Sequence, residues 1–125
     1  MEKEKKKILL LEDYPDLIEY YTGRLRLAGF EVISEADEER GVELALKERP
    51  DLAILDISLP KADDFWFLSE IKKHAEISNL PVIILTDLFE KNDVKRGIEA
   101  GASDYLIRQN YTFVEVVDRI KKVIR

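Results

Sequence analysis

The amino-acid sequence predicts an α/β fold in which helices cover both faces of a doubly wound, five-stranded parallel sheet. The first observation is a strict alternation of short apolar runs with longer amphipathic segments along the 125 residues. The second is that several runs consist almost entirely of Val, Ile and Leu, a pattern typical of parallel strands buried on both faces. Alternating strands and helices with short connections favour right-handed crossovers and the strand order 2-1-3-4-5.

The expected strands are short apolar runs bounded by charged or turn-forming residues. Pro50 and Pro81 lie just before the third and fourth runs and separate them from the preceding segments. The five runs lie at residues 7–12, 31–35, 52–56, 82–86 and 104–107.

The expected helices are recognised by the signals at their ends. Pro15 suits the first turn of the first helix, and Gly29 suits the position after its end. Asp37 is the expected N-cap of the second helix. Thr112 and Glu115 have the spacing of a capping box at the start of the last helix. The five helices are expected to begin near residues 15, 37, 63, 92 and 112.

Acidic and polar residues follow the apolar runs. Glu12 and Asp13 end the first run, Asp56 the third, Thr86 the fourth and Arg108 the fifth. Because the carboxyl ends of parallel strands meet at one edge of the sheet, we expect these side chains to lie together. The switch point between the first and third strands is also where ligands bind in such sheets.

The acidic residues at this edge predict a cation site. Three carboxylates on adjacent strands repel one another unless one is protonated or a cation joins them. Oxygen ligands without His or Cys select a hard divalent ion, so Mg²⁺ or Mn²⁺ is expected. The alternative is an exposed acidic cluster that pairs with surface lysines. A nucleotide module is disfavoured because no Gly-rich turn follows the first strand.

Composition excludes several other classes of protein. The formal net charge of −6 argues against a nucleic-acid-binding surface that tracks phosphates. No stretch reaches the roughly 18 apolar residues that a membrane span needs, and the start lacks the apolar segment of a signal peptide. With no cysteine, disulfides and thiolate metal sites are excluded. We therefore expect one domain over residues 1–125, with no output domain and no membrane contact, in the cytoplasm.

The segments LLLED, LAILDISLP, VIILT and GASDYLIR resemble, in this order, the receiver domain of two-component response regulators. The resemblance covers essentially the whole chain and implies a flavodoxin-like fold. It implies that Asp56 accepts a phosphoryl group from a histidine kinase or phosphotransfer protein, in a phosphorelay. The chain would then be a phosphoacceptor and not an enzyme.

The resemblance also implies roles for the neighbouring residues. Asp13, Asp56 and the backbone carbonyl of Ser58 would coordinate Mg²⁺, and Glu12 would act through water. Thr86 would hydrogen-bond a phosphoryl oxygen, as would the basic residue at position 108. Tyr105 would turn inward when Thr86 moves.

The face formed by the fourth helix, fifth strand and fifth helix is expected to be the mobile, partner-contacting face. The family uses this surface, either for a downstream protein or for a homodimer. Gly97 lies in the middle of the fourth helix, whose apolar stripe is thin and consists chiefly of Val94 and Ile98.

The sequence departs from the family pattern in three places. Arg108 and Gln109 replace the usual lysine and the proline after it, Asp87 replaces a small residue after Thr86, and Asp64 replaces a glycine. We expect Asp87 and Arg108 to form a salt bridge over the mouth of the site, which would hold the guanidinium away from Asp56. The alternative is that both side chains point into water.

Two other functions compete with phosphoacceptance. A degenerate receiver would never turn over phosphate and would work as a constitutive protein-binding module. A haloacid-dehalogenase-like phosphatase also uses an aspartyl nucleophile, but it carries Asp-x-Asp-x-Thr after its first strand. The sequence after Asp56 is Ile-Ser-Leu-Pro, which does not match.

Overall fold

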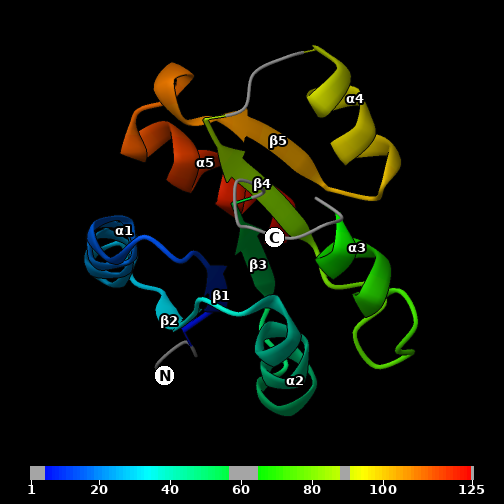
Figure 1. The fold of residues 1–125 in the computed structure, drawn as a ribbon. Coiled ribbons are helices and arrows are strands. Elements are labelled where there is room, and N and C mark those ends of the chain that lie inside the picture. Colours follow the sequence, from blue (N-terminus) through cyan, green and yellow to red (C-terminus); the bar gives the residue numbers. More distant parts are fainter. Residues whose placement is uncertain (1–4, 57–64, 88–90, 125) are drawn as a thin grey trace.

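The computed structural model describes residues 5–56, 65–87 and 91–124. It contains five parallel strands in the order β2-β1-β3-β4-β5, as the alternation of segments predicts (Figure 1). The strands are β1 (Lys7–Leu11), β2 (Glu31–Glu35), β3 (Leu52–Leu55), β4 (Val82–Thr86) and β5 (Asp104–Ile107). The helices are α1 (Pro15–Leu27), α2 (Glu38–Glu48), α3 (Trp66–Ile71), α4 (Lys91–Glu99) and α5 (Phe113–Ile124), with a short 3₁₀ turn at Arg108–Asn110.

The predicted capping residues of two helices form their hydrogen bonds. The Asp37 side chain accepts a hydrogen bond from the backbone N–H of Glu39 at the start of α2. At the start of α5, the Thr112 hydroxyl accepts from the Glu115 N–H, and the Glu115 carboxylate accepts from the Thr112 N–H. The third helix begins at Trp66 among the described residues, whereas the expected start near residue 63 lies outside them.

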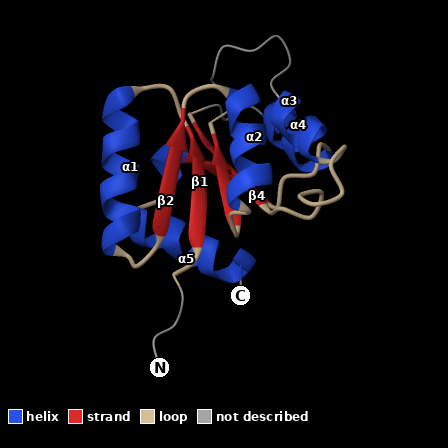
Figure 2. Cartoon of the chain, turned by 90° about the horizontal axis from the view of Figure 1, so that it is seen from below, coloured by secondary structure: helices blue, strands red, loops and turns tan. Residues whose placement is uncertain are grey.

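Two apolar layers enclose the sheet. On one face, α1 and α5 bury Leu25, Val116 and Ile120 against strand residues such as Ile8 and Leu106. The opposite face is packed against α2, α3 and α4, and its core includes Val42, Phe67, Leu68, Ile71 and Ile84. Figure 2 shows the sheet between these two groups of helices. All residues of β3 and β4 are buried, which accounts for their continuous apolar sequence.

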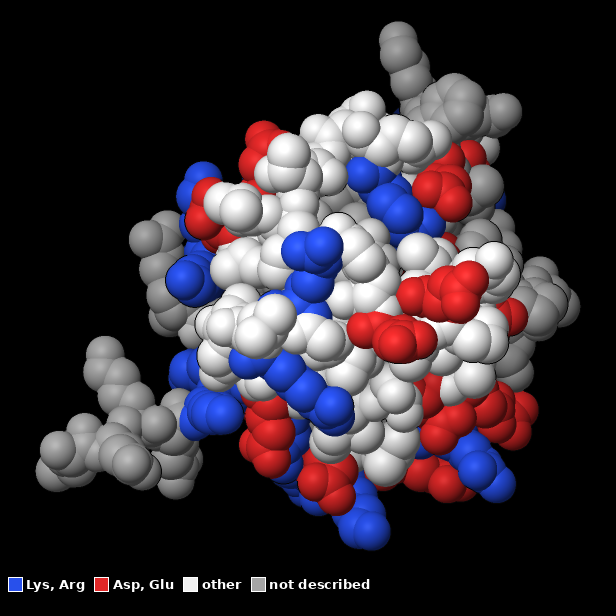
Figure 3. Space-filling view, turned by 90° about the vertical axis from the view of Figure 1, so that its left-hand side faces the viewer, with Lys and Arg blue, Asp and Glu red and all other residues white. Residues whose placement is uncertain are grey.

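Figure 3 shows the side of the molecule that carries α1, on which Lys and Arg are interspersed with Asp and Glu. Within the described residues, no helix has the length and apolar character required to span a bilayer.

Candidate phosphoacceptor site

Backbone pairing at the carboxyl edge of the sheet places two acidic residues side by side. The Asp56 N–H donates to the Leu11 carbonyl (3.2 Å), and the Glu12 N–H donates to the Glu35 carbonyl (3.1 Å), so both residues continue the sheet by one hydrogen bond. Their side chains are buried, since Glu12 is 2% exposed and Asp56 is 4% exposed. The prediction that Glu12 and Asp56 lie together at the ends of neighbouring strands is confirmed.

Glu12 is held by the start of the loop that follows β1. Its Oε2 accepts hydrogen bonds from the backbone N–H groups of Asp13 (3.0 Å) and Tyr14 (3.2 Å). Burial, and with it the nearby charge of Asp56, nevertheless outweighs the two amides and raises the pKa of Glu12 to about 7. This carboxyl group is therefore poised to exchange a proton, or to lose it when a cation approaches.

Arg108 is the positive partner of both carboxylates. Its Nη2 donates to Asp56 Oδ2 (3.2 Å) and to the Leu85 carbonyl (3.2 Å), and it lies 3.5 Å from Glu12 Oε1. Burial lowers the pKa of Arg108, but the hydrogen bond to Tyr21 and the charge of Asp56 outweigh it, so the net shift is upward. The guanidinium is therefore a fixed positive charge inside the site.

The predicted pair between Asp87 and Arg108 forms, but one consequence drawn from it is wrong. Arg108 Nη1 lies 3.0 Å from Asp87 Oδ1, at ion-pair distance though not aligned as a hydrogen bond. The pair does not hold the guanidinium away from Asp56, because Nη2 reaches Asp56 while Nη1 faces Asp87. The planar fork of arginine makes both contacts at once, because a different nitrogen atom faces each carboxylate.

A hollow of about 350 Å³ opens above the buried pair. Asp13 and Asp87, both exposed, line it together with Glu12 and Asp56. We call it the acidic hollow. No three acidic or histidine side chains in the described residues already converge as a metal site, so the expected grouping of Glu12, Asp13 and Asp56 is not preformed. The donor chemistry still suits a hard cation, because all four side chains offer oxygen ligands. Ser58 lies outside the described residues, as does Asp64.

Thr86 and Tyr105 occupy neighbouring strands beside the site. Thr86 is fully buried at the end of β4 and is paired in register with Ile107 of β5. Tyr105 is also buried, and its ring lies against α4 where Gly97 leaves room for it. A Cβ atom at Gly97 would lie 2.8 Å from Tyr105 Cδ2 and 3.0 Å from Ile84 Cδ1. The structure therefore shows Tyr105 in an inward position and supplies a packing reason for glycine in α4.

Tyr21 is a site neighbour that sequence reasoning missed. Its hydroxyl accepts a hydrogen bond from Arg108 Nε (3.1 Å), although 87 positions separate the two residues in the chain. The sequence feature that could have predicted such a neighbour is Arg108 itself. A buried guanidinium needs a hydrogen-bond acceptor for its Nε–H, a donor that lysine does not have.

Comparison with known proteins agrees with this geometry. The family model described as "Response regulator receiver domain" matches residues 8–121, and the chain belongs to this family. It is 34% identical over 122 residues to the "Probable transcriptional regulator ycf27" of Porphyridium aerugineum, a match that covers 98% of this chain and 49% of that protein. The chain thus spans about half the length of the curated relatives it matches.

Solved structures show the same fold. A putative response regulator from Chloroflexus aurantiacus superposes with a TM-score of 0.89 at 30% identity, covering 97% of this chain and 98% of that chain. The receiver domain of a sensor histidine kinase from Pseudomonas aeruginosa superposes with a TM-score of 0.86 at 28% identity, covering 97% and 98%. That protein was crystallised with a magnesium ion coordinated in its active-site cleft.

Proposed function

We propose that this receiver accepts a phosphoryl group on Asp56 from a histidine kinase or phosphotransfer protein, in the cytoplasm and with Mg²⁺ or Mn²⁺ present. One observation carries the proposal: Asp56 is a buried carboxylate at the end of a central strand, with Glu12 and Arg108 around it and the acidic hollow above it. Burying charged side chains costs free energy, and buried charged groups cluster at functional sites.

The chemistry follows from the groups present. An oxygen of the Asp56 carboxylate attacks the phosphorus of a phosphohistidine, the P–N bond breaks, and the imidazole nitrogen leaves with the electron pair and takes up a proton. The product is an acyl phosphate on Asp56. Arg108 Nη2, which now donates to Asp56 Oδ2, would donate to a phosphoryl oxygen. The Thr86 hydroxyl would donate to another. The chain acts as an acceptor that is used once per transfer, and not as an enzyme with its own substrate.

Asp13 and Asp56 would hold the divalent ion, with the carbonyl of Ser58 as a further ligand and Glu12 acting through water. When bound, the ion neutralises negative charge that gathers between the carboxylates and the incoming phosphoryl group. The magnesium ion in the cleft of the similar Pseudomonas receiver supports this assignment.

We propose that the face formed by α4, β5 and α5 carries the signal to a downstream protein or to a second copy of the chain. Tyr105 of β5 is buried and its ring packs against α4 at Gly97, so we expect a change near Thr86 to reach this face through this ring. Ile98 on α4 is 48% exposed and offers an apolar contact for a partner.

Intact-mass spectrometry after incubation with acetyl phosphate tests the proposal. We expect one added phosphoryl group in the presence of Mg²⁺, none in EDTA, and none on Asp56→Asn. The adduct should be lost on treatment with hydroxylamine, as an acyl phosphate is. If wild type and Asp56→Asn behave alike under all conditions, phosphoacceptance is wrong and the chain is a phosphorylation-independent binding module.

A further inference from the structure

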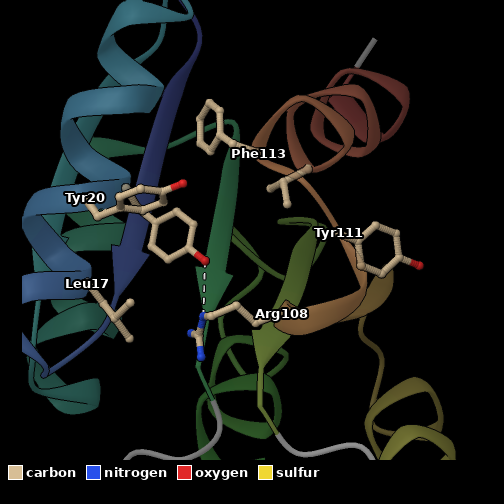
Figure 4. A pocket seen from close by; sticks show the side chains of 7 residues that line it. Leu17, Tyr20, Arg108, Tyr111 and Phe113 are labelled. Carbon is tan, nitrogen blue, oxygen red and sulfur yellow. Dashed lines mark hydrogen bonds between the residues drawn. The ribbon is translucent and has the colours of Figure 1, made fainter.

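Tyr21 links helix α1 to the charged site through a hydrogen bond. Its ring is buried, and its hydroxyl accepts the hydrogen bond from Arg108 Nε. Figure 4 shows Arg108 reaching across from the end of β5 toward α1, with this bond as the dashed line. The Tyr21 ring also packs edge-on against the Tyr20 ring, with the ring centroids 5.1 Å apart. Tyr20 packs in the same way against Phe113 of α5, with the ring centroids 6.4 Å apart.

The contacts of Arg108 divide according to its three nitrogen atoms. Nε faces Tyr21, Nη2 faces Asp56 and Glu12, and Nη1 faces Asp87. Because the guanidinium is planar, fixing Nε fixes the direction in which both Nη atoms point. The Tyr21 hydroxyl therefore aims the positive charge at the two buried carboxylates.

A divalent cation held at Asp56 and Glu12 would compete with the guanidinium for the same two carboxylates. Asp56 Oδ2 accepts from Nη2, and Glu12 Oε1 lies within ion-pair distance of the same nitrogen. A cation that binds these oxygens must weaken the contacts to Nη2. By linkage, any group that stabilises the present position of Arg108 weakens cation binding by the same factor.

We infer that Tyr21 is a positioning residue of the phosphoacceptor site, which holds Arg108 against Asp56 and Glu12 and so sets the affinity for the divalent cation. This inference rests on the proposed function, since it concerns the cation that the transfer to Asp56 uses. A cavity of about 280 Å³ borders Tyr21 and the guanidinium, so Arg108 has space to move into when its contacts are released.

A conservative pair of variants tests the inference. Tyr21→Phe keeps the ring and removes the hydroxyl. Tyr20→Phe is the matched control, because no hydrogen bond to the Tyr20 hydroxyl is present among the described residues and its side chain is 43% exposed. Free Mn²⁺ is measured by electron paramagnetic resonance during titration of the full chain, with no phosphodonor present. We expect Tyr21→Phe to bind Mn²⁺ about fivefold more tightly than wild type, and Tyr20→Phe to bind like wild type.

Repeating the measurement in an Arg108→Lys protein separates the effect of the Tyr21 hydroxyl on Arg108 from a general effect on packing. Lysine has no donor equivalent to Nε, so Tyr21→Phe should leave Mn²⁺ affinity unchanged in an Arg108→Lys protein. A change of equal size in both backgrounds, or no change in either, overturns the inference.

The acetyl phosphate assay distinguishes the two levels of failure. If Mn²⁺ affinity ignores the Tyr21 hydroxyl while Asp56 is still phosphorylated, the positioning role is wrong and the proposed function stands. If none of the variants binds Mn²⁺ and phosphorylation does not depend on a divalent ion, the inference and the metal requirement of the proposed function are both wrong.

Discussion

Whether Gly97→Ala in α4 stabilises or destabilises the protein depends on the buried ring of Tyr105. In an exposed helix interior, replacing glycine by alanine stabilises by about 1 kcal/mol, because alanine restricts the unfolded chain and favours the helix. Gly97 is buried, and a Cβ there would lie 2.8 Å from Tyr105 Cδ2 and 3.0 Å from Ile84 Cδ1. Contacts this short force neighbouring groups to move.

The magnitude follows from the two opposing effects. Overpacking a buried site costs roughly 1–3 kcal/mol, against the gain of about 1 kcal/mol in helix propensity. We therefore expect Gly97→Ala to lower the free energy of unfolding by about 1 kcal/mol. Gly23 in α1 is the matched control, because a Cβ there would meet no atom within 4 Å. Gly23→Ala should raise the free energy of unfolding by up to about 1 kcal/mol.

Urea denaturation followed by circular dichroism measures both changes, with the slope of the transition as a check on two-state behaviour. A double-mutant cycle then assigns the cost to the ring: in a Tyr105→Val background, the destabilisation by Gly97→Ala should shrink by about 1 kcal/mol. If Gly97→Ala stabilises the protein as much as Gly23→Ala does, Tyr105 does not pack against α4 as described, and the proposed path from the site to this face loses its support.

Two further predictions concern charge in the site. Folding raises the pKa of Glu12 from 4.5 to about 7, so its contribution to the free energy of unfolding is fully present below pH 4.5 and is lost as the pH rises through about 7. The loss amounts to at most roughly 3 kcal/mol. Urea titrations in EDTA between pH 5 and 8 should show this decrease, and Glu12→Gln should remove it. Asp87 is 62% exposed, so Asp87→Ala should change stability by less than about 1 kcal/mol. Removing its charge should speed phosphorylation by acetyl phosphate about fivefold, as expected for one screened like charge near the donor; an unchanged rate would show that Asp87 does not restrict access.

The fold was predictable because local signals and the global arrangement agree. The fully buried strands β3 and β4 required continuous apolar runs, and the capping residues of α2 and α5 marked where these helices begin. The position of Glu12 and Asp56 followed from strand ends alone, since parallel pairing brings the carboxyl ends of β1 and β3 together. Backbone register therefore carried this part of the site prediction.

The side-chain arrangement around Arg108 was not predictable in the same way. Asp87 and Arg108 leave adjacent strands, so their pairing could be inferred from topology. The direction of the guanidinium depends on Tyr21, a residue of α1. Nothing in the sequence around Tyr21 indicates that its hydroxyl accepts a hydrogen bond from Arg108. A long side chain with several rotatable bonds takes its direction from such tertiary partners, and neither helix period nor strand register encodes them.

The same contacts bear on whether the departures from the family pattern indicate a degenerate receiver. Arg108 is matched to its surroundings: Tyr21 accepts from Nε, Leu85 and Asp56 accept from Nη2, and Asp87 lies beside Nη1. A lysine could not make this set of contacts, so the arginine, Tyr21 and Asp87 act as one arrangement. Replacing a buried ion pair by apolar residues is often neutral or stabilising, which means that stability gives no reason to retain the charges. Stability alone therefore does not account for these buried carboxylates, which agrees with the proposed role of Asp56 as phosphoacceptor.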